Sequence, residues 1–295
     1  MTDELAVVAL GGGHGLASTL RAARQYATTI SGVASVADDG GSTGRLRREL
    51  GVPAPGDLRK CLVALAADEH DVWPTAFEHR FSAGELENHA LGNLMIVGLA
   101  ESLGDFEQAL QVAGELLGAV GRVLPATLDP VVLKAEVAGR AVEGQVAVQN
   151  AQGRIRRVEL IPADARATPS VIDAIGEADQ IVLAPGSLYT SLLPVLCVRG
   201  IRDALRASTA PIVQVCNLAP QLPETEGLDA TDHLRAVCAH GTNVDSFVYQ
   251  GGGRLESDDA AIEALGVRSV AADVSGRAAW AHDPAKLARV LRALL

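Results

Sequence analysis

The chain has 295 residues, of which 48% are hydrophobic and 3% aromatic, and its formal net charge at pH 7 is -11. This composition predicts a globular protein with a sizeable aliphatic core. The acidic balance argues against nucleic acid and anionic membranes as partners, because both are negatively charged.

The cysteines and the chain start indicate the compartment. Cys61, Cys197, Cys216 and Cys238 lie far apart in apolar segments, which is typical of reduced core residues. No apolar run reaches the ~18 residues of a membrane span. The start Met-Thr-Asp-Glu lacks the basic residues of a signal peptide. We therefore expect a cytoplasmic protein.

The first predicted elements are a buried strand over 7–10 and a helix that follows it. Glycines allow a close backbone approach to an anion, and the first turn of a helix attracts negative charge. We therefore predict phosphate binding here, with a turn that only packs strand on helix as the alternative. The candidate residues in the turn are Gly11, Gly12, Gly13, His14 and Gly15.

The spacing of these glycines fits neither of two common nucleotide loops. The dinucleotide fingerprint needs glycine at its sixth position, where the registers from Gly11 and Gly13 place Leu16 and Ser18. The phosphate loop of NTPases needs Lys-Ser or Lys-Thr after its glycines, and neither follows. An NAD-dependent oxidoreductase is therefore disfavoured.

A second buried strand is predicted over 30–37, and it ends at the adjacent carboxylates Asp38 and Asp39. Ligands bind at the carboxyl ends of parallel strands, so this pair could hold a cation, a sugar hydroxyl or a backbone N–H group. A polar turn is the alternative. Ser42, in the same loop, is a further candidate.

Two predicted helices carry further candidates. Asp57 is either the N-cap of a helix or a ligand contact, and Arg59 could reach an anion at that helix start. A nearly all-apolar helix is predicted over 85–102, with His89 and Asn93 sharing one face. Such polar groups either face a ligand or bond to nearby backbone.

The period then changes to that of strands. Four strands are predicted over 123–127, 131–139, 142–150 and 155–161, as in an antiparallel meander. Strand-helix alternation resumes after them. We therefore predict one α/β domain over 1–295, with a β-rich insertion at about 123–161.

A second site-like stretch spans 180–193, where an apolar strand leads through a glycine to several hydroxyls. A capped helix with Ser187 as N-cap is the alternative to a ligand site. Asn217 ends another predicted strand, where an amide could read a base or a ribose. The candidates in the stretch are Gly186, Ser187, Tyr189, Thr190 and Ser191.

Six motifs together resemble the bacterial gluconeogenesis factor family: GGGHGLAST, VADDGGSTGRLR, APGDLRKCLVALA, NHALGNL, LAPGSLYTSLLP and VCNLAPQLPETEG. Members of that family bind uridine diphosphate sugars and support cell shape and the supply of envelope precursors. The family is structurally similar to the phospholactate transferase of deazaflavin cofactor biosynthesis. The resemblance implies an open, mostly parallel, Rossmann-like α/β sheet with helices on both faces.

This chain departs from the family pattern at two places. The first loop of the family usually reads GGGTG, and His14 here replaces the threonine hydroxyl with a group that titrates near neutral pH. Pro223 stands where the later family loop has glycine. The resemblance implies a nucleotide or nucleotide-sugar site built from the first loop, Asp38, Asp39, the Asn93 face, residues 186–191 and Asn217.

Two functions follow as expectations. The first is a regulator that binds a uridine diphosphate sugar or related nucleotide and directs carbon into cell-wall precursors. The second is a transferase in which Asp38 or Asp39 holds Mg²⁺ at a diphosphate. No Ser-His-Asp arrangement is readable in the sequence, which favours the regulator. A regulatory protein partner and self-association are left open.

Overall fold

The computed structural model describes residues 4–278 and 280–295. The first three residues, part of the start in which we expect no signal peptide, lie outside the described residues. In the part of the chain that the structure describes, no helix combines the length and apolar character needed to cross a membrane.

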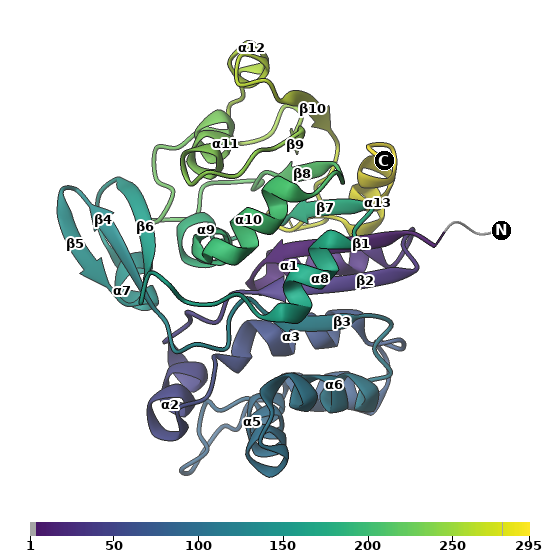
Figure 1. The fold of residues 1–295 in the computed structure, drawn as a ribbon, viewed down its shortest axis with the longest axis vertical. Coiled ribbons are helices and arrows are strands. Elements are labelled where there is room, and N and C mark those ends of the chain that lie inside the picture. The colour runs from purple at the N-terminus through teal and green to yellow at the C-terminus, as the bar shows by residue number, and fades with distance from the viewer. Residues whose placement is uncertain (1–3, 279) are drawn as a thin grey trace.

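A seven-stranded sheet with the order β10-β9-β8-β7-β1-β2-β3 forms the centre of the molecule (Figure 1). All of its pairings are parallel, which confirms the predicted α/β sheet. β7 and β8 are mainly aliphatic and are buried along their whole length, because helices cover both faces of a parallel sheet. The strands span Ala6–Gly11 (β1), Thr29–Ala34 (β2), Arg122–Pro125 (β3), Gln180–Leu183 (β7), Ile212–Val215 (β8), Ser246–Gln250 (β9) and Arg268–Ala272 (β10).

Helices cover both faces of this sheet, as right-handed crossovers require. On one face α1 (Gly13–Ala23) packs against α3 (Pro55–Leu65) and α13 (Pro284–Arg292). On the other face α10 (Arg199–Ala207) packs against α8 (Pro169–Gly176) and α9 (Leu193–Cys197) (Figure 1). The remaining helices are α2 (Gly41–Leu50), α4 (Val72–Glu78), α5 (Leu91–Leu103), α6 (Phe106–Leu116), α11 (Ala230–Ala239), α12 (Asp259–Glu263) and the π-helix η1 (Leu188–Leu192).

The insertion is a three-stranded antiparallel sheet with the order β5-β4-β6, and it carries one short helix, α7. Its elements span Val132–Val137 (β4), Arg140–Glu143 (β5), Gln145–Asn150 (α7) and Ile155–Ile161 (β6).

Two predictions about the insertion are wrong. Residues 123–125 belong to β3 of the parallel sheet, because a short apolar run suits either kind of strand. The strand predicted over 142–150 ends at Glu143, and α7 follows after Gly144, whose φ of +95° interrupts the strand.

Two predicted helix starts are also wrong. α5 begins at Leu91, and the residues before it form turns in which Asn88 has a φ of +66°, so His89 precedes the helix. α3 begins at Pro55 after the N-cap Ala54, because proline suits the first helical position. Asp57 therefore lies in the first turn of α3 and is not its N-cap.

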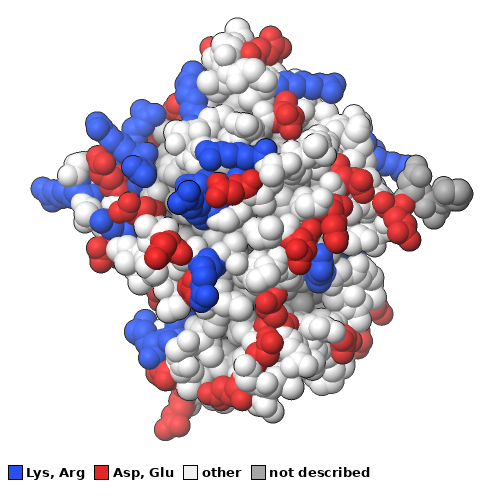
Figure 2. Space-filling view, viewed as in Figure 1, with Lys and Arg blue, Asp and Glu red and all other residues white. Residues whose placement is uncertain are grey.

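The surface shown in Figure 2 carries both signs of charge. Acidic and basic side chains are interspersed over this face, including the region of the inserted sheet. The core beneath is mainly aliphatic, with Phe77 and Phe247 among its largest fully buried side chains.

Candidate functional site

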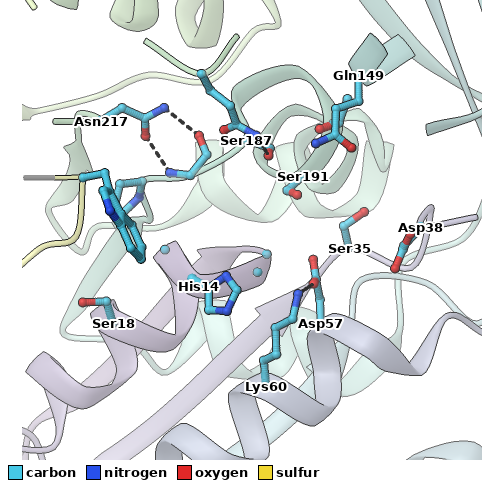
Figure 3. Close-up of a pocket in the computed structure, with 18 of the residues that line it drawn as sticks. His14, Ser18, Ser35, Asp38, Asp57, Lys60, Gln149, Ser187, Ser191 and Asn217 are labelled. Atoms are coloured by element: carbon cyan, nitrogen blue, oxygen red, sulfur yellow. Dashed lines mark hydrogen bonds and ion pairs between the residues drawn. The ribbon is translucent and has the colours of Figure 1, made fainter. Parts of the chain in front are cut away.

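A cavity of about 600 Å³ opens where β1, β2, β7 and β8 end (Figure 3). The loops after these strands meet because parallel strands direct their carboxyl ends to one edge of the sheet. The lining from these loops comprises residues 12–15, Ser35, Asp38, Gly40, residues 185–187 and residues 217–221.

The loop after β1 is pressed against the loop after β7. A Cβ on Gly15 would lie 1.8 Å from the carbonyl oxygen of Pro185, so only glycine fits at this position. Gly13 has a φ of +58°, which glycine adopts most easily. The first turn of α1 therefore begins at the cavity, and its backbone N–H groups lack helical acceptors there, as at every helix start.

Glu224 holds the start of η1 in place, where the loop after β7 ends. This buried carboxylate accepts hydrogen bonds from the N–H groups of Tyr189 at 2.7 Å and Thr190 at 3.2 Å, and from the Thr190 hydroxyl at 3.0 Å. Burial raises the pKa of Glu224, while these hydrogen bonds lower it. Thr190 and Ser191 line the cavity, whereas Tyr189 packs in the core.

The amide of Asn217 fixes Gly186. Its Oδ1 accepts from the Gly186 N–H at 2.6 Å, and its Nδ2 donates to the Gly186 carbonyl at 2.8 Å (Figure 3). The Ser187 hydroxyl accepts from Gln221 Nε2 at 2.6 Å. The amide of Asn217 was predicted to read a base or a ribose. In this structure it binds the backbone of Gly186 and so shapes the loop after β7.

Two carboxylates and one lysine give the cavity its charge. Lys60 lies 3.0 Å from an oxygen of Asp57, and both line the cavity with Asp38. Burial raises the pKa of Asp38, the N–H of Gly40 lowers it, and the negative charge of Asp57 raises it further. The Lys60 ammonium is a cation of the kind that pairs with phosphate groups.

His14 lies on the exposed rim of the first loop and lines the cavity (Figure 3). Partial burial lowers its pKa below 6.5, and the nearby Lys60 ammonium lowers it further. The neutral imidazole therefore predominates at pH 7 in the free protein.

Besides Tyr189, further predicted site residues lie outside this lining. Gly11 is the last residue of β1 and packs against Ala184. Asp39 turns to α7, where its carboxylate accepts from the N–H groups of Gln145 and Val146. Ser42 and Asn93 belong to the buried cluster described next.

The buried cluster joins α2 to α5. The Ser42 hydroxyl lies 3.0 Å from His89 Nδ1, and Asn93 Nδ2 donates to Ser42 at 3.3 Å. His89 and Asn93 thus do converge, although only Asn93 lies on the helix. Among residues 4–278 and 280–295, Asn93 Oδ1 has no hydrogen-bond partner.

Sequence reasoning missed Lys60, Glu224 and the α7 glutamines Gln145 and Gln149, all of which line or support the cavity. One signal was readable, because Pro55 at a helix start places Asp57 and Lys60 on one face at i, i+3. Arg59 was predicted to reach an anion at the helix start. It instead lies buried, donates to the Phe77 carbonyl and pairs with Glu78.

The residues present fit Mg²⁺ in one way. Asp38 and Asp57 are two carboxylates in one cavity, and Mg²⁺ is commonly held by one or two carboxylates together with substrate phosphates and waters. The described part of the chain has no group of three or more His, Cys, Asp and Glu side chains that could hold a metal. The ion would therefore be shared with a bound diphosphate.

The chain belongs to the 2-phospho-L-lactate transferase CofD family, whose model matches residues 7–284. This finding and the relatives below confirm the resemblance drawn from the six motifs.

Two curated relatives are each named gluconeogenesis factor. That of Bacillus subtilis strain 168 is 42% identical over 242 residues, which cover 81% of this chain and 76% of the relative. That of Halalkalibacterium halodurans is 43% identical over 236 residues, covering 79% and 73%. A crystal structure of a UPF0052 family protein from Bacillus halodurans superposes with a TM-score of 0.94 at 36% identity, covering 98% of this chain and 99% of that one.

Proposed function

We propose that the chain binds a uridine diphosphate sugar in the cavity of Figure 3 and acts as a regulator. In this role it senses the ligand and directs carbon into cell-wall precursors and the maintenance of cell shape under gluconeogenic growth. The names of the relatives support the link to gluconeogenesis. The free thiols of all four cysteines agree with a cytoplasmic location.

One observation carries the ligand class. The start of α1, held against Pro185 by Gly15, lies in the same cavity as the Lys60 ammonium. Helix N–H groups and a lysine together suit a diphosphate. The cavity of about 600 Å³ extends beyond this point and has the size typical of small-molecule sites.

Titration calorimetry with UDP-glucose and UDP-N-acetylglucosamine tests the proposal. We expect wild type to bind at least one of them, and Lys60→Ala to weaken binding at least about tenfold, because a charged hydrogen bond to phosphate is lost. Lys134→Ala is the matched control, since Lys134 pairs with Glu159 on the inserted sheet outside the cavity. Wild type that binds neither sugar nucleotide contradicts the proposal.

A transferase is the second candidate, favoured by the family match and by the pair Asp38 and Asp57. Bound Mg²⁺ would neutralise charge that grows on a diphosphate during transfer. In this reading both carboxylates hold the ion and Lys60 orients the phosphates. Magnesium-dependent conversion of a nucleotide by wild type, lost in Asp38→Asn with binding retained, would establish the transferase.

A further inference from the structure

Asp39 connects the loop after β2 to the insertion. Its Oδ2 accepts from the Gln145 N–H at 3.0 Å, and its Oδ1 accepts from the Val146 N–H at 2.9 Å. The approach is tight, because a Cβ on Gly144 would lie 2.8 Å from Asp39 Oδ2. Both carboxylate oxygens therefore cap α7, while the neighbouring Asp38 lines the cavity.

The helix held in this way forms a wall of the cavity. Gln145, Val146 and Gln149 all line it from α7. Val148 is fully buried beneath the helix, and α7 packs between β4 and η1. The position of the two glutamine amides thus depends on the cap that Asp39 provides.

The two ends of the cavity differ in chemistry. Figure 3 shows Asn217 and Ser18 at one end, Gln149 and Asp38 at the other, and His14 between them. The Ser18 hydroxyl donates to the carbonyl of His282. Trp280, two residues before His282, also lines the cavity and so lies at this end. That indole is 73% exposed.

Each kind of surface suits a different part of a nucleotide sugar. A base is a flat ring that stacks on aromatic side chains, and Trp280 offers such a face. A sugar presents many hydroxyls, each both a donor and an acceptor, which match the amides and the carboxylate at the α7 end. The diphosphate then lies between these ends, over the start of α1.

We propose that the α7 wall binds the glycosyl group through Gln145 and Gln149, and that Asp39 is the positioning residue that holds this wall. This inference rests on the proposed function. It assigns to the insertion the recognition of the sugar, as distinct from the nucleoside diphosphate that the parallel sheet holds.

Calorimetry with UDP, UDP-glucose and UDP-N-acetylglucosamine tests this assignment on the full chain. Gln149→Ala should weaken the preferred sugar nucleotide about tenfold and change UDP affinity less than about twofold, because only hydrogen bonds to the sugar are lost. Asp39→Asn keeps one acceptor oxygen. It should therefore also weaken the sugar nucleotide more than UDP, but by a smaller factor than Gln149→Ala. Trp280→Ala should weaken all bound ligands alike.

The controls separate the possible failures. Gln152→Ala changes an exposed glutamine just beyond α7 and should bind like wild type, and thermal melting confirms that each variant folds. Wild type that binds neither UDP nor its sugars contradicts the proposed function. The inference alone is overturned if wild type binds UDP and a UDP sugar but Gln149→Ala or Asp39→Asn weakens UDP as strongly as the sugar nucleotide. It is also overturned if such a variant weakens neither ligand.

Discussion

Gly15 and Pro185 meet at the point where the two loops of the candidate site join. A Cβ on Gly15 would lie 1.8 Å from the Pro185 carbonyl oxygen, well inside any real contact. The start of α1 and the loop after β7 therefore form one continuous surface. The cavity is built on this contact, so its geometry depends on a residue that has no side chain.

Gly15→Ala should consequently lower stability and impair ligand binding together. The added methyl group has to push the two loops apart, and overpacking of this kind costs about 1–3 kcal/mol of unfolding free energy. Urea unfolding measures the change. Gly98→Ala is the control, because Gly98 lies in α5 with open space around its Cβ position and should be neutral or stabilising. Equal stability of the two variants would contradict the close contact.

Glu224→Ala should destabilise the start of η1. The change leaves the buried N–H groups of Tyr189 and Thr190 without their acceptor, which costs about 1–3 kcal/mol. Urea unfolding should show this loss, and calorimetry should show weaker nucleotide binding. Glu226→Ala removes an exposed carboxylate two residues away and should do neither. A Glu224→Ala variant with wild-type affinity would mean that the loop does not shape the site.

His14 should make ligand binding depend on pH. Its pKa in the free protein lies below 6.5, and a bound diphosphate raises it, so the complex takes up a proton. Affinity should therefore rise as the pH falls through the pKa of His14 in the complex. It should level off below the pKa of His14 in the free protein. Calorimetry with a UDP-sugar from pH 8 to 5.5 should show a gain of up to about tenfold. His14→Thr should abolish it, and an unchanged profile in that variant would place the titration elsewhere.

His282 should contribute to acid lability. Burial lowers its pKa from 6.5 to about 4, although its Nε2–H donates to the Cys216 carbonyl at 3.1 Å. Between these values the unfolded chain binds a proton that the folded protein excludes, so stability falls as the pH drops from 6.5 to 4, by about 3 kcal/mol. His282→Gln keeps an N–H donor and should flatten this part of the urea-unfolding profile. The exposed His70→Gln should not, and parallel profiles for wild type and His282→Gln would refute the assignment.

Much of the parallel sheet was readable because its strands are continuous aliphatic runs. The strand predicted over 7–10 lies within β1, and the strand-glycine-helix order at residues 6–18 matches β1 and α1. β3 was misassigned because a short apolar run carries no information about the direction of its partner.

Helix α7 could not be predicted, since its cause lies far away in the chain. Val142, Val146 and Val148 occur at even spacings, as in a strand, and the cap that favours the helix comes from Asp39, 106 residues before Gln145. The same long-range contact separates the roles of Asp38 and Asp39. Two adjacent carboxylates are equivalent in the sequence, and only the tertiary structure directs one to the cavity and the other to α7.

Native mass spectrometry of the wild-type protein with UDP-glucose or UDP-N-acetylglucosamine, in the presence and absence of Mg²⁺, tests the central claim most directly. We predict a one-to-one complex at the mass of the intact sugar nucleotide, and recovery of that ligand unchanged after hours of incubation. If neither ligand forms a complex with the protein, nucleotide-sugar binding is contradicted. A magnesium-dependent change in ligand mass would show instead that the protein is an enzyme.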